Sequence, residues 1–242
     1  MADLRNYQSR AQTGEMIDQG LRAYMLKVYN LMALGLAITG VAAYIGFNLA
    51  VQDNQLTQFG ELLFRSPLRW VVILAPLAVV FFLSFRINRM SVASAQATFW
   101  AYAALVGLSL SSIFLVYTQS SITQTFFVTA ASFGALSLYG YSTKRDLSAM
   151  GSFLIMGLFG VIIASLVNVF LASSALQFAI SVIGVLIFAG LTAYDTQRIK
   201  ELYFDGDASE VAGRKAIMGA LTLYLDFINL FMFLLQFMGN RK

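Results

Sequence analysis

The segment Phe178–Lys200, FAISVIGVLIFAGLTAYDTQRIK, joins a long apolar run to a charged end. Phe178 to Ala189 is apolar enough to lie in a lipid bilayer, so Asp195 falls near the end of a hydrophobic helix. The next apolar segment, Ala216–Met238, contains a second carboxylate, Asp226. Ionisable groups are costly in membrane-spanning helices and usually serve a function there. Asp195 and Asp226 are therefore the first candidates for functional residues.

The composition is that of a polytopic membrane protein. Of the 242 residues, 59% are hydrophobic and 12% are charged, whereas a soluble domain has about 45–50% apolar and about 25% charged residues. The chain has no cysteine and no histidine, which excludes disulfides, thiolate chemistry and the imidazole that most often acts as a general base. The sequence contains no phosphate-binding loop, zinc-protease or nucleophile-elbow motif. We expect no enzymatic activity and no tightly bound cofactor.

Apolar runs of about 20 residues, the length that crosses a bilayer, occur seven times. We expect an all-α integral membrane protein in which residues 24–242 form a seven-helix domain, preceded by a polar cytoplasmic segment, residues 1–23. Pro76 should kink the second helix. The predicted spans are Tyr24–Leu49, Trp70–Phe85, Ala95–Tyr117, Ile122–Tyr141, Ala149–Leu171, Ala175–Ile199 and Ala216–Met238.

The distribution of basic residues predicts the orientation. With the N-terminus inside, the inner segments carry 12 of the 16 Lys and Arg residues and the outer segments carry 4. Inner loops of membrane proteins are enriched in Lys and Arg, so the N-terminus should be cytoplasmic and the C-terminus periplasmic. The net charge of +4 therefore bears on topology, and we expect no nucleic-acid partner. The inner set is Arg5, Arg10, Arg22, Lys27, Arg86, Arg89, Lys144, Arg145, Arg198, Lys200, Arg214 and Lys215.

Asp226 lies about 15 Å inside its helix, counted from Ala216 at about 1.5 Å per residue. A lone charged carboxylate at that depth is costly, so it must be protonated, paired or hydrated. Both acids enter from the cytoplasmic half of adjacent helices, and two readings remain open. Either they meet, share one proton and form a pH-sensitive site suited to Ca²⁺ when ionised, or each is neutralised separately, Asp195 by Arg198.

Arg86 and Arg89 lie in the turn after the second span. One reading is that they are only the positive charge typical of inner loops. The other is that one of them is a latch that reaches an aspartate and closes the inner mouth.

Further polar residues lie within or between the spans. Tyr194 and Tyr224 are each within two residues of an acid, and they either hydrogen-bond the pair or mark the depth of the membrane interface. Asn168, Asn229 and Gln236 are expected to form hydrogen bonds between helices. The acids Asp205, Asp207 and Glu210 lack the spacing of an EF-hand loop and are interpreted as a solvated turn.

Two motifs give the chain a specific resemblance. Tyr194-Asp195-Thr196-Gln197, followed by Leu223–Phe231 (LYLDFINLF), resembles the Bax inhibitor-1 family, also called the transmembrane Bax inhibitor motif family. The Lys144–Leu147 turn and the Arg86–Arg89 turn fit the same pattern.

The resemblance implies seven helices, with the last one central and surrounded by the other six. It also implies a pH-sensitive Ca²⁺ leak controlled by an aspartate pair, here Asp195 and Asp226, with Arg86 or Arg89 as the latch. Some bacterial relatives are instead thought to restrain a membrane-bound AAA protease, for which Met1–Gly20 would be the docking segment. We expect a bacterial inner-membrane protein that passively conducts Ca²⁺, or, alternatively, a non-conducting partner of such a protease or stress response.

Overall fold

The computed structural model describes the backbone of residues 2–53 and 55–242, and the side chains of residues 18–53 and 55–242. Within these residues seven helical segments are long and apolar enough to cross a membrane. This confirms the predicted all-α integral membrane fold. The helices are α1 (Ala2–Ala50), α2 (Gln58–Phe64), α3 (Leu68–Arg86), α4 (Val92–Leu110), α5 (Ile113–Val116), α6 (Gln119–Ser142), α7 (Ser148–Leu171), α8 (Ser174–Glu201) and α9 (Ser209–Met238).

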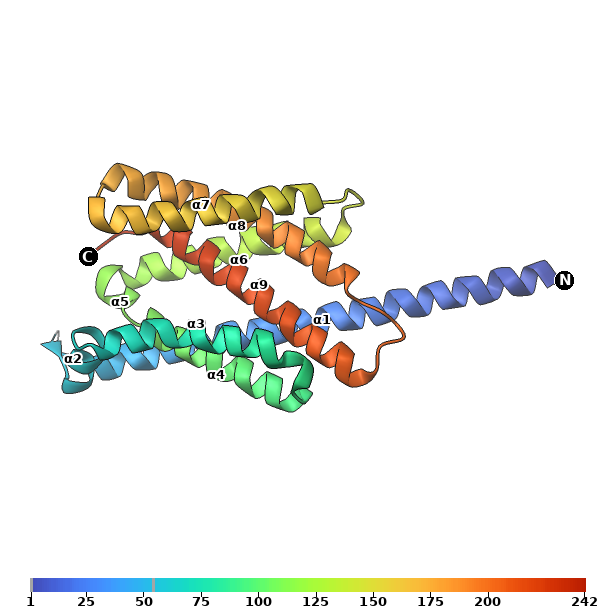
Figure 1. The fold of residues 1–242 in the computed structure, drawn as a ribbon, viewed down its shortest axis with the longest axis horizontal. Helices are drawn as coiled ribbons and strands as arrows, with labels where there is room; N and C mark the ends of the chain where they lie inside the picture. Colours follow the sequence, from blue (N-terminus) through green and yellow to red (C-terminus); the bar gives the residue numbers. More distant parts are fainter. Residues whose placement is uncertain (1, 54) are drawn as a thin grey trace.

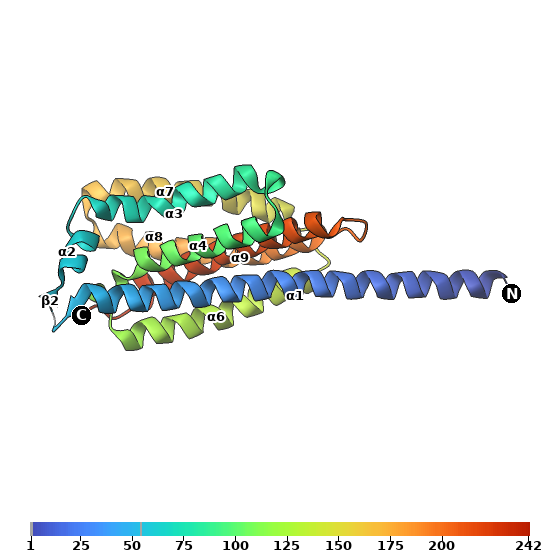
Figure 2. The same ribbon diagram turned by 90° about the horizontal axis from the view of Figure 1, so that it is seen from below.

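The last helix, α9, lies at the centre of the bundle, as predicted (Figures 1 and 2). It packs mainly against α1, α4, α6 and α8, while α3 lies farther out against α4 and α7 lies farther out against α8. In Figure 1, α9 crosses obliquely between the α7–α8 pair and the α3–α4 pair. Because α9 has neighbouring helices on several sides, it carries the largest buried share of any span.

Small residues let neighbouring helices approach the first half of α9. Gly213, Ala216, Gly219 and Ala220 are all buried. A Cβ on Gly219 would lie only 2.9 Å from a side-chain carbon of Ile199, on α8. Lipid tails are as apolar as the side chains, so helix association in a membrane relies on close van der Waals packing of this kind.

The third predicted span is not one continuous helix. It is divided into α4 and α5 by a turn at Ser111 and Ser112. The Ser111 hydroxyl donates to the Leu108 carbonyl over 2.6 Å, and the Ser112 hydroxyl donates to the Ser109 carbonyl over 3.2 Å. Serine side chains that bond the carbonyls of the preceding turn compete with the helical ladder, which accounts for the break.

The predicted polar loop, Ala50–Arg69, contains regular structure. The strands β1 (Val51–Gln52) and β2 (Gln55–Leu56) pair antiparallel, and α2 follows them. Thr57 caps α2, since its hydroxyl accepts a hydrogen bond from the Gly60 backbone N–H over 3.1 Å. Gly60 lies so close to the Ala50 carbonyl that a Cβ there would collide with it, so α2 folds back onto the end of α1.

The other boundaries extend the predicted ones. Helix α1 continues without a break past Tyr24, so the predicted division between residues 23 and 24 falls inside a continuous helix. The side chains of residues 1–17, which make up most of the predicted docking segment Met1–Gly20, lie outside the described residues. The short 3₁₀ helix η1 (Ile87–Arg89) follows α3 directly, and α3 continues through Pro76 without interruption.

The bundle has two ends with different charge. We call the end formed by the connections 87–91, 143–147 and 202–208 the basic end, because most Lys and Arg residues lie there. The other end contains α2, the α7–α8 connection and the C-terminus (Figure 1). There the final residues pair with the start of α6, as the Thr118 N–H donates to the Asn240 carbonyl over 3.1 Å.

Candidate functional site

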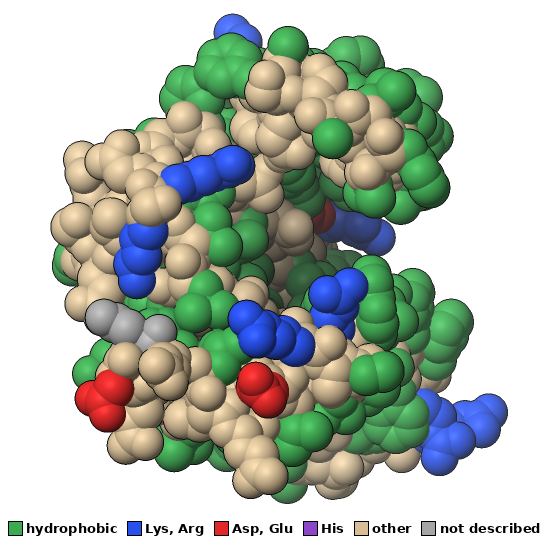
Figure 3. Space-filling model, turned by 90° about the vertical axis from the view of Figure 1, so that its left-hand side faces the viewer, with side chains coloured by type: hydrophobic (Ala, Val, Ile, Leu, Met, Phe, Trp, Pro, Cys, Tyr) green, Lys and Arg blue, Asp and Glu red, His purple; other side chains and the backbone are tan. Residues whose placement is uncertain are grey.

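A cavity of about 690 Å³ lies between α7, α8 and α9. Most of its lining is apolar, and seven of its sixteen lining residues come from one face of α7. Figure 3, which views the molecule from the end with the C-terminus, shows that the surface is hollowed and that acidic and basic side chains are visible inside the hollow. The polar residues that line the cavity are Ser165, Asp195, Arg198, Thr222, Asp226 and Asn229.

The structure brings the two predicted acids together in this cavity. Asp195 comes from α8 and is partly buried, while Asp226 comes from α9 and is only 4% exposed. Their carboxyl groups are within hydrogen-bonding reach of each other. Two residues that are 31 positions apart in the chain therefore form one polar site inside the bundle.

The contact between the acids requires a proton. An ionised carboxylate only accepts hydrogen bonds, so two of them bond each other only when one is protonated. The Oδ2 atom of Asp226 is buried and has no donor among the described side chains and backbone groups. A single proton held between Asp195 and Asp226 lets the two carboxyl groups bond each other and removes one buried charge. Such a pair titrates as a unit rather than as two independent acids.

Arg198 is the one basic residue in the cavity lining. It lies one turn after Asp195 on the same face of α8, and its positive charge acts on that carboxylate. The two groups do not form an ion pair within 4.0 Å, and the Arg198 side chain is exposed. The cavity therefore combines two acids with one arginine that has no direct partner among the described side chains.

Arg86 and Arg89 lie elsewhere. Both side chains are exposed at the basic end, neither lines the cavity, and neither forms an ion pair with a described acid. In this structure the latch that sequence reasoning assigned to one of them is not formed. The physical reason is the path of the chain: the turn between α3 and α4 packs on the start of α9, several helical turns before Asp226.

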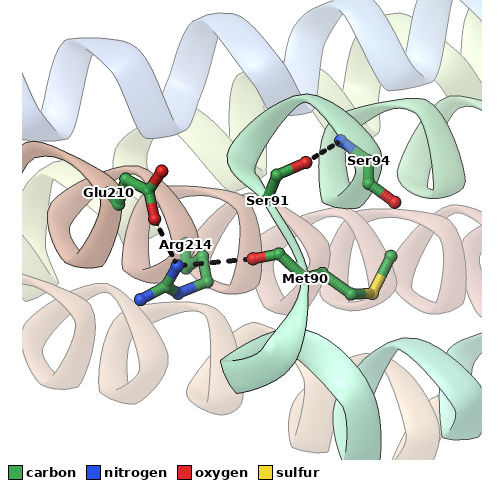
Figure 4. A network of polar contacts seen from close by, with 5 residues as sticks. All are labelled: Met90, Ser91, Ser94, Glu210 and Arg214. Carbon is green, nitrogen blue, oxygen red and sulfur yellow. Dashed lines mark hydrogen bonds and ion pairs between the residues drawn. The ribbon is translucent and has the colours of Figure 1, made fainter.

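A different arginine holds this turn in place. Nη1 of Arg214, on α9, donates to the Met90 carbonyl over 3.3 Å and contacts Oε2 of Glu210 at 3.2 Å (Figure 4). In the same turn the Ser91 hydroxyl caps α4 by accepting from the Ser94 backbone N–H over 3.2 Å (Figure 4). Sequence reasoning counted Arg214 only as inner positive charge and missed this contact with the backbone.

The three predicted supporting residues have different surroundings. The Tyr224 hydroxyl is 2.6 Å from Thr39 Oγ1 on α1, and its ring packs edge-on against Phe99. The Tyr194 ring packs against Gly151, on α7. Asn229 lines the cavity, but its amide donates to the Leu225 carbonyl of its own helix over 2.8 Å. Of the three, only Asn229 shares the cavity with the acids.

Other polar side chains join helices to one another. Asn168 donates to Gln177 over 3.1 Å, and Gln177 donates to Gln236 over 2.8 Å, which links α7, α8 and α9. Gln197 accepts from the Leu147 N–H and donates to the Arg145 carbonyl, so it fixes the α6–α7 turn on α8. Gln177 could have been found from the sequence, because it is an amide that is followed by the apolar run Phe178–Ala189.

The charged connection before α9 forms local contacts. Lys215 pairs with Asp207, and the Tyr203 hydroxyl donates to Asp205 over 3.1 Å. In the part of the chain that the structure describes, His, Cys, Asp and Glu residues do not gather in groups of three that would hold a metal ion. The cavity acids thus supply two carboxylates, fewer oxygens than the six to eight ligands that Ca²⁺ usually takes.

Comparison with known proteins agrees with this architecture. Residues 21–242 match the family model described as "Inhibitor of apoptosis-promoting Bax1". An uncharacterized protein of Rickettsia prowazekii is 48% identical over 242 residues, which cover 100% of both chains. An uncharacterized protein of Caulobacter vibrioides is 49% identical over 230 residues, or 93% of this chain and 92% of the relative. The inner membrane protein YbhL of Escherichia coli K12 is 48% identical over 226 residues, or 92% and 94%.

Proposed function

The chain belongs to the Bax inhibitor family, and from that premise we propose that it is a pH-sensitive Ca²⁺ leak channel controlled by the Asp195–Asp226 pair. We place it in the bacterial inner membrane, with the basic end and the N-terminus in the cytoplasm. The observation that carries the proposal is the contact of two carboxyl groups inside a cavity of a membrane-spanning bundle.

The pair supplies a chemical switch. While one proton is shared, the carboxyl groups attract each other and join α8 to α9. When the proton leaves, two negative charges lie at short range in a poorly solvated site, and their repulsion favours separation of the two helices. The freed oxygens are hard ligands that suit Ca²⁺. In this scheme Ca²⁺ is the permeant ion, held only in passing by Asp195 and Asp226.

Arg198 has a part in this scheme. Its charge offsets the single negative charge that the proton-sharing pair retains, which keeps the cavity close to neutral. Because Arg198 lies on α8, one turn from Asp195, it favours the ionised form of Asp195 over that of Asp226. We therefore place the shared proton mainly on Asp226, the more deeply buried acid.

The test is a flux measurement. The purified full-length chain is reconstituted into liposomes that contain a Ca²⁺ indicator, and the rate of Ca²⁺ entry is followed across a range of pH. We expect a pH-dependent rate in the wild type that becomes independent of pH in Asp195→Asn and in Asp226→Asn. Asp205→Asn, which removes an acid from the connection before α9, is the matched control and should keep the wild-type profile.

Two results would contradict the proposal. One is a flux no greater than that of empty liposomes at every pH. The other is a pH profile that both single variants leave unchanged. Absence of flux together with co-purification of a membrane-bound AAA protease through Met1–Gly20 would favour the alternative function, that of a non-conducting partner.

A further inference from the structure

The cavity between α7, α8 and α9 has a second property that ion conduction does not use. Its α7 wall consists of the apolar residues Ile155, Leu158, Val161, Ile162, Leu166 and Val169, together with Ser165. Several of these are open to the outside of the bundle: Ile162 is 47% exposed and Leu166 is 61% exposed. In a membrane-spanning helix that outside is lipid, so the cavity is a groove that opens to the bilayer.

The dimensions of the groove match a lipid tail. From Ile155 to Val169 the α7 wall rises about 21 Å at about 1.5 Å per residue. One leaflet supplies about half of a hydrocarbon core that is about 30 Å thick, or about 15 Å. On α8, the distance from Arg198 to Phe188 along the same groove is also about 15 Å. A single acyl chain with its phosphate on Arg198 therefore reaches about as far as Phe188, which lies beside the first part of the α7 wall.

The groove has a cationic group at its basic end, where the headgroup of a bound lipid would lie. Arg198 is in the last turn of α8, at the membrane boundary of the basic end. No acceptor for its guanidinium occurs among the hydrogen bonds and ion pairs of the described residues. Guanidinium groups bind phosphate through two parallel hydrogen bonds, and a guanidinium at headgroup depth meets phosphate oxygens directly.

Neighbouring charges favour an anionic lipid over a zwitterionic one. The inner end of α8 contacts the α6–α7 turn through Gln197 and through Lys200, whose Nζ donates to the Tyr141 carbonyl over 2.8 Å. That turn carries Lys144 and Arg145. Counted with Arg198, these four basic residues face three negative charges, those of Asp146, Glu201 and the proton-sharing pair, so the mouth of the groove keeps a net positive charge.

We propose that the groove between α7, α8 and α9 binds an anionic phospholipid, with the lipid phosphate on Arg198 and one acyl chain along the α7 wall. The chain then covers the open side of the cavity, where water would find few polar partners besides the two acids. The headgroup occupies the arginine that faces Asp195. This binding site does not depend on ion conduction and can be tested without a flux measurement.

The test uses phosphatidylglycerol that carries a photoreactive diazirine in the middle of one acyl chain. The full-length protein is reconstituted in phosphatidylcholine vesicles with a trace of this probe, illuminated and mapped by mass spectrometry. A phosphatidylcholine probe with the same acyl chain is the comparison lipid. We expect the phosphatidylglycerol probe to label the first part of the groove face of α7, around Ile155 and Leu158, more strongly than the comparison lipid.

Variants assign the headgroup contact. Arg198→Gln should lower the labelling of α7 by phosphatidylglycerol about fivefold, the effect expected for one basic residue near a membrane surface. Arg198→Lys keeps the charge and should retain most of the labelling, which separates loss of recognition from loss of folding. Arg89→Gln removes an exposed arginine from the same end, outside the groove, and should have no effect.

The proposal fails if both probes label α7 equally, or if Arg198→Gln leaves the labelling unchanged. It also fails if labelling is confined to the outward faces of other helices, because the groove would then not hold the chain. Inorganic phosphate added at high concentration should not compete, since the acyl chain supplies much of the affinity; full competition would identify a soluble anion as the ligand instead.

Discussion

Tyr224 and Asp226 are two residues apart on α9, yet they have opposite surroundings. The Tyr224 hydroxyl is fully buried and bonds Thr39 Oγ1 at 2.6 Å, and Thr39 in turn donates to the Ala103 carbonyl over 2.8 Å. Asp226 is also buried but faces the cavity, and its Oδ2 has no hydrogen-bond partner among the described side chains and backbone groups. We call the face of α9 around Tyr224 the sealed face, because it packs against α1 and α4 and the Tyr224 hydroxyl is bonded there. We call the face around Asp226 the open face, because it lines the cavity.

Tyr224 and Asp226 illustrate two kinds of buried polar group, one that stabilises the fold and one that can change its protonation state. A buried polar group with all its partners present stabilises one arrangement of helices. A buried acid that needs a proton to bond another acid has two states, protonated and ionised. A change in pH can therefore make or break the contact between the two acids. If this interpretation is correct, changes on the sealed face should lower stability, while changes on the open face should alter function and leave the bundle intact.

The largest expected effect on stability comes from a pair of glycines. Gly107, on α4, faces the sealed side, and a Cβ there would collide with the Thr39 carbonyl oxygen. Gly160, on α7, has nothing within 4 Å of such a Cβ. Gly107→Ala should destabilise the protein by about 3 kcal/mol, the upper end for overpacking, because the neighbour is backbone. Gly160→Ala should be neutral or slightly stabilising through helix propensity.

Thermal unfolding of both variants in the same detergent measures this difference. Equal melting temperatures for Gly107→Ala and Gly160→Ala would show that α1 and α4 are not in close contact, and the sealed face would lose its main support.

Thr39→Val should have the next largest effect. It keeps the size of the side chain but leaves the Tyr224 hydroxyl and the Ala103 carbonyl without the partner that joined them. An unsatisfied buried polar group costs about 1–3 kcal/mol, so we expect a loss of about 2 kcal/mol. Tyr224→Phe removes one hydroxyl and should cost about 1 kcal/mol. Denaturant titration of the two variants should rank them in this order, and the reverse order would mean that Thr39 is not the centre of the network.

Asp226→Asn tests the open face with a smaller change in stability. The substitution removes an ionisable group from a membrane-spanning helix, so the variant should insert and melt at least as well as the wild type. The gain should be at most about 1 kcal/mol, because in the native pair only one charge is present. Membrane yield and melting temperature measure it. A marked loss in either would show that Asp226 has a structural ion-pair role, which would erase the contrast with Tyr224.

The smallest expected effect lies at the rim of the open face, where α7 begins. Hydrogen bonds from the hydroxyl and the backbone N–H of Ser148 lower the pKa of Asp146 below its usual value. A carboxyl whose pKa is lowered in the folded state adds stability above its unfolded pKa, and that contribution is lost as pH falls through the folded pKa. Asp146→Ala should therefore melt slightly below the wild type at neutral pH.

The difference between Asp146→Ala and the wild type should vanish in acid. Ser148→Ala, which keeps the backbone donor, should lie between the two proteins at neutral pH. A difference that persists unchanged at low pH would mean that packing, rather than the ionised carboxylate, supports the start of α7.

Much of the fold and part of the site follow from the sequence. Seven apolar runs with basic connections predict the spans, and the cost of a carboxylate in lipid singles out Asp226. The break at Ser111 was not predictable from hydropathy, because serine is compatible with an apolar helix until its hydroxyl bonds the preceding carbonyl. Likewise, hydropathy alone does not show that the polar loop before α3 contains α2.

The assignment of site residues shows where sequence distance misleads. Tyr224 is near Asp226 in the chain, but a separation of two positions turns a helical side chain to the far side, at about 100° per residue. Arg198, three positions after Asp195, lies on the same face as that acid. Helical periodicity thus favours Arg198 as the cavity arginine, whereas Arg86 and Arg89 were assigned to the site by resemblance and lie outside the cavity in this structure.

The claim on which the account depends is that Asp195 and Asp226 share one proton within the bundle. Infrared difference spectroscopy of the reconstituted protein, recorded across a pH titration, detects protonated carboxyl groups directly. We predict one protonated carboxyl band that titrates in the wild type and is changed by Asp195→Asn and by Asp226→Asn alike. Two bands that titrate independently, or a band that persists when either acid is replaced, would contradict the account.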